Sequence, residues 1–167
     1  GTIRYTRIEF AGYDVSGGAN TELNALSSYA VGSGTTYEYI QALAGLDDHF
    51  EFWGGAVDSR YLISYESGDD HFDTSEGHVG RHQFLIGFQG TRLDPAPGAG
   101  EVSTDPQGFE MDGCAGSGCA AGTRSEPFTN PIFANVTMVG NPAEPQTSGG
   151  RGLVLRRGHL GFLSNLI

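Results

Sequence analysis

Hydrophobic and polar residues alternate in short runs along this chain. Seven runs rich in β-branched and aromatic residues lie between Gly-containing turns, at residues 3–10, 35–42, 61–65, 83–88, 132–139, 152–155 and 160–163. In Tyr37-Glu38-Tyr39-Ile40-Gln41, apolar and polar side chains alternate with the period of two that is typical of a half-buried strand. No stretch sustains helical spacing over about ten residues. The pattern predicts an all-β chain with very little helix.

One tetrapeptide occurs twice. Asp-Asp-His-Phe stands at residues 47–50 and again at 69–72, which is 22 residues further on. The same spacing relates Ile40 to Leu62 and Gly55 to Gly77. A fixed period of this size in a β-rich sequence is typical of a solenoid. We therefore expect a parallel β-helix with coils of about 22 residues, in which equivalent residues of successive coils stack about 4.8 Å apart.

Two segments interrupt the periodicity. Residues 90–131 and 140–150 are rich in Gly, Pro, Asp and Ser, and they are expected to be long loop insertions. The length fits a single β-helix domain over residues 1–167. Because the chain begins and ends inside strand-like patterns, and a solenoid needs capped ends, we expect it to be part of a longer chain.

The charge of the chain excludes several partners. It carries nine Arg, no Lys and twenty acidic residues, which gives a net charge of −11. A surface of this kind repels phosphate backbones and anionic lipid, so nucleic acid is not expected as a partner, whereas cations are favoured. No apolar run approaches the roughly 20 residues that span a bilayer, so no transmembrane segment is predicted.

The only two cysteines are Cys114 and Cys119, separated by four small residues. This spacing favours a local disulfide, while two free thiols or a metal site remain alternatives. A disulfide would indicate an oxidising compartment, which means a secreted or cell-surface protein.

The doubled motif predicts a stack of acidic side chains. Asp47 should lie over Asp69, and Asp48 over Asp70; Glu51 likewise pairs with Asp73, and His49 with His71. Two unit charges about 5 Å apart repel by roughly 3 kcal/mol at an effective dielectric near 20. Three interpretations remain open: the Asp side chains cap backbone N–H groups at the coil corner, they bind a cation, or they act as catalytic acids. For a cation, Ca²⁺ is the candidate, held by Asp47, Asp48, Asp69, Asp70 and Asp73.

The period and the Gly-containing turns resemble the right-handed parallel β-helix of the pectin lyase-like class. The chain is also similar to secreted bacterial β-helix proteins and lipoproteins that carry Asp-Asp-x-Phe-Glu-Phe-x-Gly-Gly, here residues 47–55, followed by Gly-Asp-Asp-x-Phe-Asp, here residues 68–73. This resemblance implies the fold but no particular activity. From the fold and the acidic stack together we expect a structural, adhesive or ligand-binding module of a larger exported assembly, with calcium as its candidate stabilising ion.

A second similarity, to the polygalacturonase family of glycoside hydrolases, supports an alternative function. Asp48 would correspond to the last residue of that family's Asn-Thr-Asp motif, and Asp69 and Asp70 to its Asp-Asp motif one coil later. The resemblance implies a polysaccharide-degrading enzyme in which these three residues supply the general acid and the water-activating base. The family's Gly-His-Gly and Arg-x-Lys motifs have no counterpart in this chain.

Aromatic and histidine side chains are the remaining candidates for ligand contacts. Trp53 and Tyr65 are expected to face outward and to be able to stack on a sugar ring, and His71 and His78 could hydrogen-bond a substrate. The other aromatic residues of these runs are expected to pack in the core, namely Tyr37, Tyr39, Tyr61, Phe84 and Phe88. A transition-metal site built from several histidines is not expected, because His71 and His78 should lie on different walls.

Overall fold

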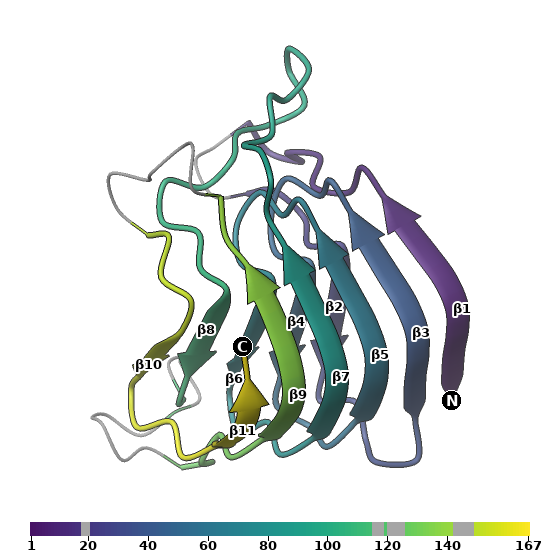
Figure 1. Ribbon diagram of the computed structural model, residues 1–167, viewed down its shortest axis with the longest axis vertical. Helices are drawn as coiled ribbons and strands as arrows, with labels where there is room; N and C mark the ends of the chain where they lie inside the picture. Colours follow the sequence, from purple (N-terminus) through teal and green to yellow (C-terminus); the bar gives the residue numbers. More distant parts are fainter. Residues whose placement is uncertain (18–20, 115–118, 120–125, 142–148) are drawn as a thin grey trace.

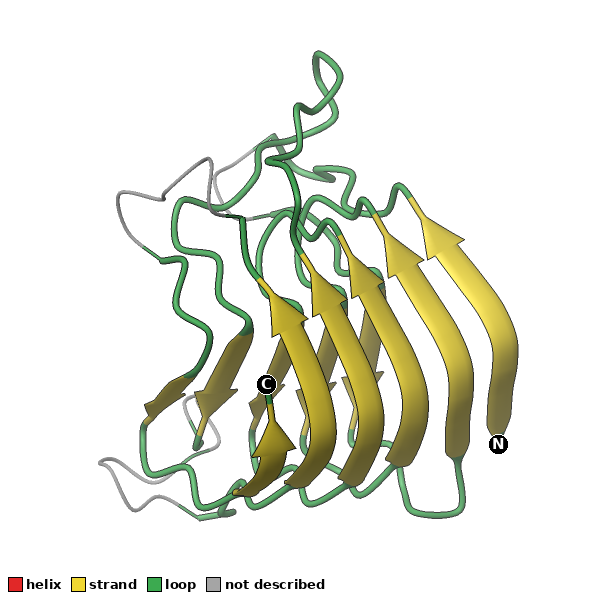
Figure 2. Ribbon diagram, viewed as in Figure 1, coloured by secondary structure: helices red, strands yellow, loops and turns green. Residues whose placement is uncertain are grey.

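A computed structural model of the protein describes residues 1–17, 21–114, 119, 126–141 and 149–167. These residues form eleven strands and no helix (Figures 1 and 2). The odd-numbered strands are β1 (Thr2–Glu9), β3 (Thr36–Leu43), β5 (Asp58–Tyr65), β7 (Arg81–Phe88), β9 (Ile132–Val139) and β11 (Phe162–Leu166). The even-numbered strands are β2 (Leu26–Tyr29), β4 (Phe50–Trp53), β6 (Phe72–Ser75), β8 (Phe109–Asp112) and β10 (Val154–Arg156).

The strands form two parallel sheets that face each other as the walls of a parallel β-helix (Figure 1). One sheet has the order β1-β3-β5-β7-β9-β11, and the other has the order β10-β8-β6-β4-β2. Each coil therefore contributes one strand to each wall, and successive coils stack side by side. The all-β solenoid that the sequence predicts is confirmed.

The register of the coils follows the sequence period. Ile40 lies beside Leu62 in one sheet, and Phe50 lies beside Phe72 in the other. Glu51 lies beside Asp73, as the doubled motif predicts. A strand slip of one residue would turn the core residues outward, so this pattern fixes the coil register.

The core is a column of large apolar side chains between the two sheets. The rings of Phe50, Phe72 and Phe109 stack with centroids 5.5 and 5.2 Å apart, and all three side chains are fully buried. Four side chains of the opposite sheet pack in the same core and are also fully buried, namely Ile40, Leu62, Leu85 and Val136. Each such burial contributes roughly 1.5–3 kcal/mol to stability.

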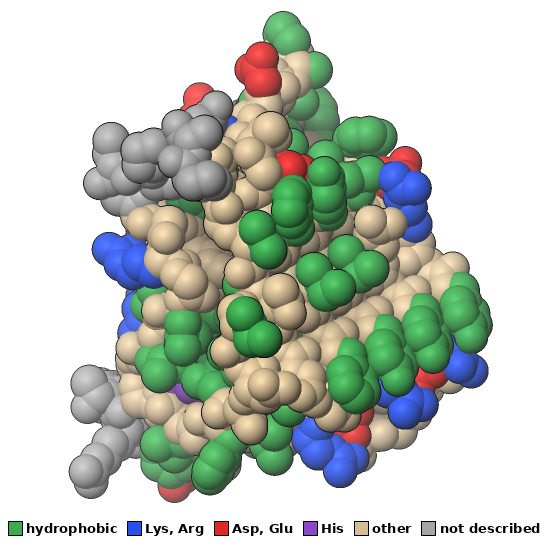
Figure 3. Space-filling view, viewed as in Figure 1, with side chains coloured by type: hydrophobic (Ala, Val, Ile, Leu, Met, Phe, Trp, Pro, Cys, Tyr) green, Lys and Arg blue, Asp and Glu red, His purple; other side chains and the backbone are tan. Residues whose placement is uncertain are grey.

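A ladder of aromatic rings crosses the outer face of the odd-numbered sheet (Figure 3). Tyr5, Tyr39, Tyr61 and Phe84 stack in order with centroids 4.9, 4.7 and 5.1 Å apart. The expectation that Tyr39, Tyr61 and Phe84 pack in the core is wrong, whereas Tyr37 is buried as predicted. The ladder residues have φ values between 51° and 61°. In a regular strand, successive side chains point to opposite faces. The left-handed conformation interrupts this alternation, so the ladder residue and the residue before it both point outward.

The first predicted loop, residues 90–131, is interrupted by a strand. Phe109–Asp112 forms β8 and pairs with β6, so this segment contains part of a coil as well as an insertion. Residues 115–118, 120–125 and 142–148 of the two predicted insertions lie outside the described residues. Cys114 and Cys119 form the predicted disulfide, with their Cα atoms 5.5 Å apart. Nothing in the described part of the chain forms a helix that is long and apolar enough to cross a membrane.

Candidate functional site

Four aspartates at the turns from the odd-numbered to the even-numbered sheet meet a fifth aspartate on β6. We call Asp47, Asp48, Asp69, Asp70 and Asp73 the acidic corner. Carboxylate oxygens of Asp47, Asp48 and Asp69 lie within 4.8 Å of one another, and so do those of Asp48, Asp70 and Asp73. Asp48 belongs to both groups. The stacking of coils therefore brings together all the aspartates that the sequence predicts as metal ligands.

Two of these aspartates hold the next coil by its backbone. Asp48 Oδ1 accepts a hydrogen bond from the Asp70 N–H at 2.9 Å, and Asp70 Oδ1 accepts one from the Gln107 N–H at 2.5 Å. Gln107 continues the series, because its Oε1 accepts the Arg151 N–H at 3.0 Å. The capping interpretation thus holds for Asp48 and Asp70. Sequence reasoning missed Gln107, since a long insertion separates it from the repeat and it is not acidic.

Asp73 differs from its neighbours because part of its carboxylate has no partner. It lies on β6 between Glu51 on β4 and Glu110 on β8, in one acidic row across the sheet. The residue is 8% exposed, and Oδ1 is buried without a hydrogen bond. In contrast, Glu51 accepts a hydrogen bond from Asn24 and Glu110 forms an ion pair with Arg156. Buried polar atoms are nearly always satisfied in folded proteins, so this oxygen has room for a bond to a retained proton or to a bound cation. The hydroxyls of Thr74 and Ser75, the next two residues of β6, are also buried without a hydrogen bond.

Burial raises the pKa values of the whole acidic corner. The pKa of Asp47 rises to about 6 and that of Asp69 to about 7, in each case mainly through loss of hydration. Burial, reinforced by the neighbouring carboxylates, holds the pKa values of Asp48, Asp70 and Asp73 well above the usual range. The same causes raise the pKa of Glu51 to about 9.

The cation that acts on Asp73 does not neutralise its charge. Arg156 lowers the pKa of Asp73 somewhat, but its guanidinium is bound to Asp112, with Nε 2.6 Å from Oδ1, and to Glu110. At neutral pH the acidic corner must therefore keep protons or take up a cation, because buried carboxylates without a partner are costly. Glu51, one residue beyond the repeated tetrapeptide, belongs to the same buried group.

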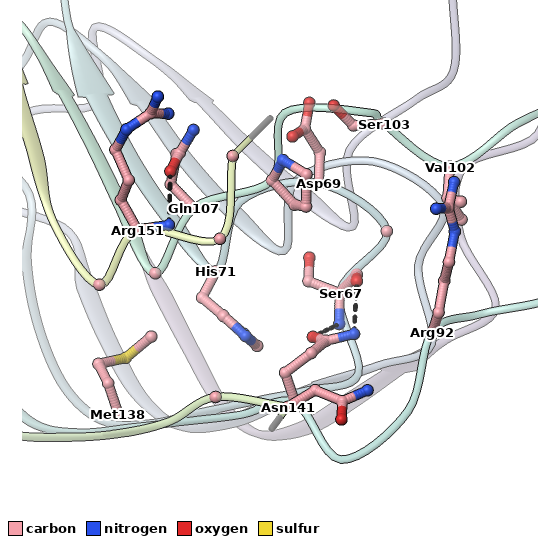
Figure 4. Close-up of a pocket in the computed structure, with 18 of the residues that line it drawn as sticks. Ser67, Asp69, His71, Arg92, Val102, Ser103, Gln107, Met138, Asn141 and Arg151 are labelled. Atoms are coloured by element: carbon pink, nitrogen blue, oxygen red, sulfur yellow. Dashed lines mark hydrogen bonds between the residues drawn. The ribbon is translucent and has the colours of Figure 1, made fainter. Parts of the chain in front are cut away.

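A cavity of about 580 Å³ adjoins the acidic corner (Figure 4). Its walls come from the turn at residues 67–69, from the insertion after β7 and from residues 149–152. Asp69 and His71 line it, whereas Asp47, Asp48 and Asp70 do not. Of the three predicted catalytic aspartates, only Asp69 reaches this space.

The predicted substrate-binding residues are spread over the molecule. Trp53 on β4 stacks on Tyr29, with centroids 4.4 Å apart, while Tyr65 on β5 stacks on Phe88 at 5.1 Å. His78 is fully buried, where Nδ1 bonds the Gly54 carbonyl at 2.9 Å. Of the four residues, only His71 lines the cavity.

Four of the five histidines form two buried groups rather than one metal centre. Nε2 of His78 and Nε2 of His82 are 2.8 Å apart, and His49 and His71 bond the same Ser64 hydroxyl. Burial lowers the pKa of His49 to about 3 and that of His71 to about 4. Within the described residues, no histidine belongs to a group of three possible metal ligands.

Comparison with known families gives one match that spans the whole chain. A family described as a pectate-lyase-like β-helix domain matches residues 1–167. The chain belongs to this family. No curated protein and no solved structure shows a significant match. Membership of the pectate-lyase-like β-helix family agrees with the parallel sheets and indicates a polysaccharide-related or structural β-helical module.

Proposed function

We propose that this chain is a structural and ligand-binding β-helix module of a secreted or cell-surface protein, and that its acidic corner binds a calcium ion. The observation that carries the proposal is the buried, unpartnered Oδ1 of Asp73, within a group of carboxylates whose oxygens lie inside 4.8 Å. The disulfide between Cys114 and Cys119 supports an oxidising, extracellular compartment.

The spacing of the carboxylates suits calcium. Ca²⁺ binds oxygen ligands at about 2.3–2.6 Å, so two ligands on opposite sides of one ion lie about 5 Å apart. Asp48 and Asp70 each use one oxygen to hold a backbone N–H, and their carboxylates keep further lone pairs for a metal. Mg²⁺ fits less well, because it demands near-ideal octahedral geometry and keeps most of its water.

A bound cation would also remove a large electrostatic cost. Two ionised carboxylates 4.8 Å apart repel by about 3.5 kcal/mol at an effective dielectric of 20. Asp73 faces two such neighbours, Asp48 and Asp70. The acidic corner therefore gains more from a divalent cation than from an additional hydrogen bond.

Polysaccharide cleavage has less support than binding. A glycosidase needs two carboxyl groups that flank the scissile bond in one cleft. Here Asp48 and Asp70 are buried and bonded to backbone N–H groups, and only Asp69 lines the cavity. The enzyme alternative predicts that Asp69→Asn abolishes hydrolysis of a polysaccharide, whereas our proposal predicts that the wild-type chain leaves a panel of polysaccharides uncut.

Thermal unfolding at pH 8 in EDTA and in CaCl₂ tests the calcium proposal. At a calcium concentration 100 times the Kd, the ion should stabilise the fold by about 2.7 kcal/mol. For a domain of this size that corresponds to a rise in Tm of about 5–11 °C. Asp73→Asn should lose most of this rise, while the control Asp94→Asn, at an exposed position on the insertion, should keep it. Equal Tm values in EDTA and CaCl₂ would sink the proposal.

A further inference from the structure

The cavity beside the acidic corner has a buried histidine in its wall. His71 is 4% exposed, yet its ring lines the cavity, where it lies between Arg151 on one side and Arg92 on the other (Figure 4). Its Nδ1 bonds the Ser64 hydroxyl in the core at 2.5 Å. Among the described residues, Nε2 has no hydrogen-bond partner. One ring nitrogen is thus fixed in the core and the other is left for the cavity.

A chain of hydrogen bonds determines which nitrogen of His71 carries the proton. The Gly45 N–H donates to His49 Nε2 at 3.0 Å, so the proton of the His49 ring is on Nδ1. That Nδ1–H donates to the Ser64 hydroxyl at 2.7 Å. The Ser64 hydroxyl then donates its own proton to His71 Nδ1, which is its other partner. His71 is therefore a neutral imidazole that holds its proton on Nε2.

Apart from its polar side chains, the wall of the cavity beside His71 offers apolar surface against which a ligand could pack. Leu93, Val102, Pro106, Met138 and Val139 contribute apolar surface. Gly140 and Gly152 stand at its exposed rim, where an added Cβ would meet no atom within 4 Å. An apolar cavity with a few convergent polar groups is the usual form of a small-molecule site.

The charges around the cavity disfavour a charged ligand at His71. Arg151 is held by Asp105, with Nη1 3.2 Å from Oδ1, and Arg92, the other cation of the wall, is not free either. Asp69 adds a carboxyl group to the same cavity. An ion that reached Nε2 would exchange water for a neutral donor and apolar walls, at a considerable desolvation cost. An uncharged acceptor would bond the Nε2–H that is accessible from the cavity without this cost.

We propose that this cavity binds a small uncharged molecule, which accepts a hydrogen bond from His71 Nε2–H through an oxygen atom and packs an apolar body against Met138 and Val102. The proposal goes beyond the calcium site. Asp69 borders both places, but the hydrogen bonds that orient His71 run through Ser64 and His49 and use none of the proposed calcium ligands.

Three probes of the same shape and different charge test this proposal. Benzamide, benzoate and benzylamine are titrated at pH 7 into the ¹⁵N-labelled full chain, and the histidine ring nitrogens are followed by long-range ¹H–¹⁵N NMR. Benzamide should shift the His71 Nε2 resonance in a saturable way, with an affinity at least about ten times that of the two ions. Benzylamine has no acceptor for Nε2–H, and benzoate must give up the hydration of its charge on entering the cavity.

Two leucine variants show whether the probe occupies this cavity. Gly152→Leu places a side chain in the open space and leaves the Ser64 hydrogen bonds intact, so it should reduce benzamide affinity at least fivefold. Gly32→Leu, at an equally open glycine on the turn before β3, should leave the affinity unchanged. The absence of a saturable shift with benzamide, tighter binding of benzoate or benzylamine, or full affinity in Gly152→Leu would each overturn the proposal.

Discussion

Replacing Asp69 with Asn should stabilise the calcium-free protein at alkaline pH. Burial raises the pKa of Asp69 to about 7 from the ordinary value of 3.8, so its carboxyl group holds a proton more tightly in the folded chain than in the unfolded chain. The stability that comes from this proton is fully present below pH 3.8 and is lost as the pH rises through 7. Asn does not titrate and is not subject to this loss.

The pKa difference gives the size of the effect. About three pKa units at 1.36 kcal/mol each amount to about 4 kcal/mol at pH 8. At pH 5 the folded Asp69 is still protonated, and the difference shrinks to less than half of this value. Asp69→Asn should therefore raise Tm by up to about 8–16 °C at pH 8, but by only about 3–6 °C at pH 5.

Differential scanning calorimetry in EDTA at the two pH values measures both numbers. Asp58→Asn is the control. Its hydrogen bonds with Arg81 lower the pKa of Asp58, so the ionised carboxylate stabilises the fold. This variant should therefore be less stable than the wild type at pH 8. The reasoning fails if Asp69→Asn is no more stable than the wild type at pH 8, or if it gains the same amount at pH 5.

Three further predictions test other parts of the fold by urea unfolding. Phe72→Ala should cost about 3–5 kcal/mol because it empties the centre of the buried ring column, and a loss as small as that of the half-exposed Phe84→Ala would contradict the role given to this column. Arg156→Ala should cost about 2–3 kcal/mol at pH 7 because it leaves the buried Asp112 with one partner fewer, whereas Arg7→Ala, in an exposed pair, should stay within about 0.5 kcal/mol. Burial lowers the pKa of His71 to about 4 from the ordinary value of 6.5, so the unfolded chain takes up a proton at this ring before the folded chain does. The contribution of the neutral ring to the free energy of unfolding is therefore fully present above pH 6.5 and is lost as the pH falls toward 4. The stability gap between wild type and His71→Gln should therefore narrow over that range, and a constant gap would refute this.

The sequence period predicts much of the fold because each coil repeats the same pattern of buried positions. Ile40 and Leu62, or Phe50 and Phe72, occupy equivalent places 22 residues apart, and the structure pairs them. The short strands β2, β4, β6 and β8 are harder to find, since four residues provide too few alternations to stand out from a turn. Alternation alone wrongly places the aromatic ladder in the core, because it does not reveal a left-handed residue such as Tyr39.

The acidic corner could be predicted only in part. Stacking of the coils follows from the repeat, so the meeting of Asp48 with Asp70 is foreseeable from the sequence. Asp70 and Asp73 differ in the contact that each makes to the following coil. Asp70 accepts a hydrogen bond from the backbone of Gln107, while one oxygen of Asp73 remains without a hydrogen bond. Gln107 follows a long insertion, and no periodicity connects it to the repeat. Likewise the cavity depends on how insertions fold over the coil edge, which local pattern does not determine.

Anomalous X-ray diffraction from crystals grown in CaCl₂ at pH 8 tests the central claim most directly. The calcium proposal predicts an anomalous peak at the acidic corner, about 2.3–2.6 Å from carboxylate oxygens of Asp48, Asp70 and Asp73. A corner without a peak, in which these carboxyl groups are joined to one another by short hydrogen bonds through retained protons, would contradict it.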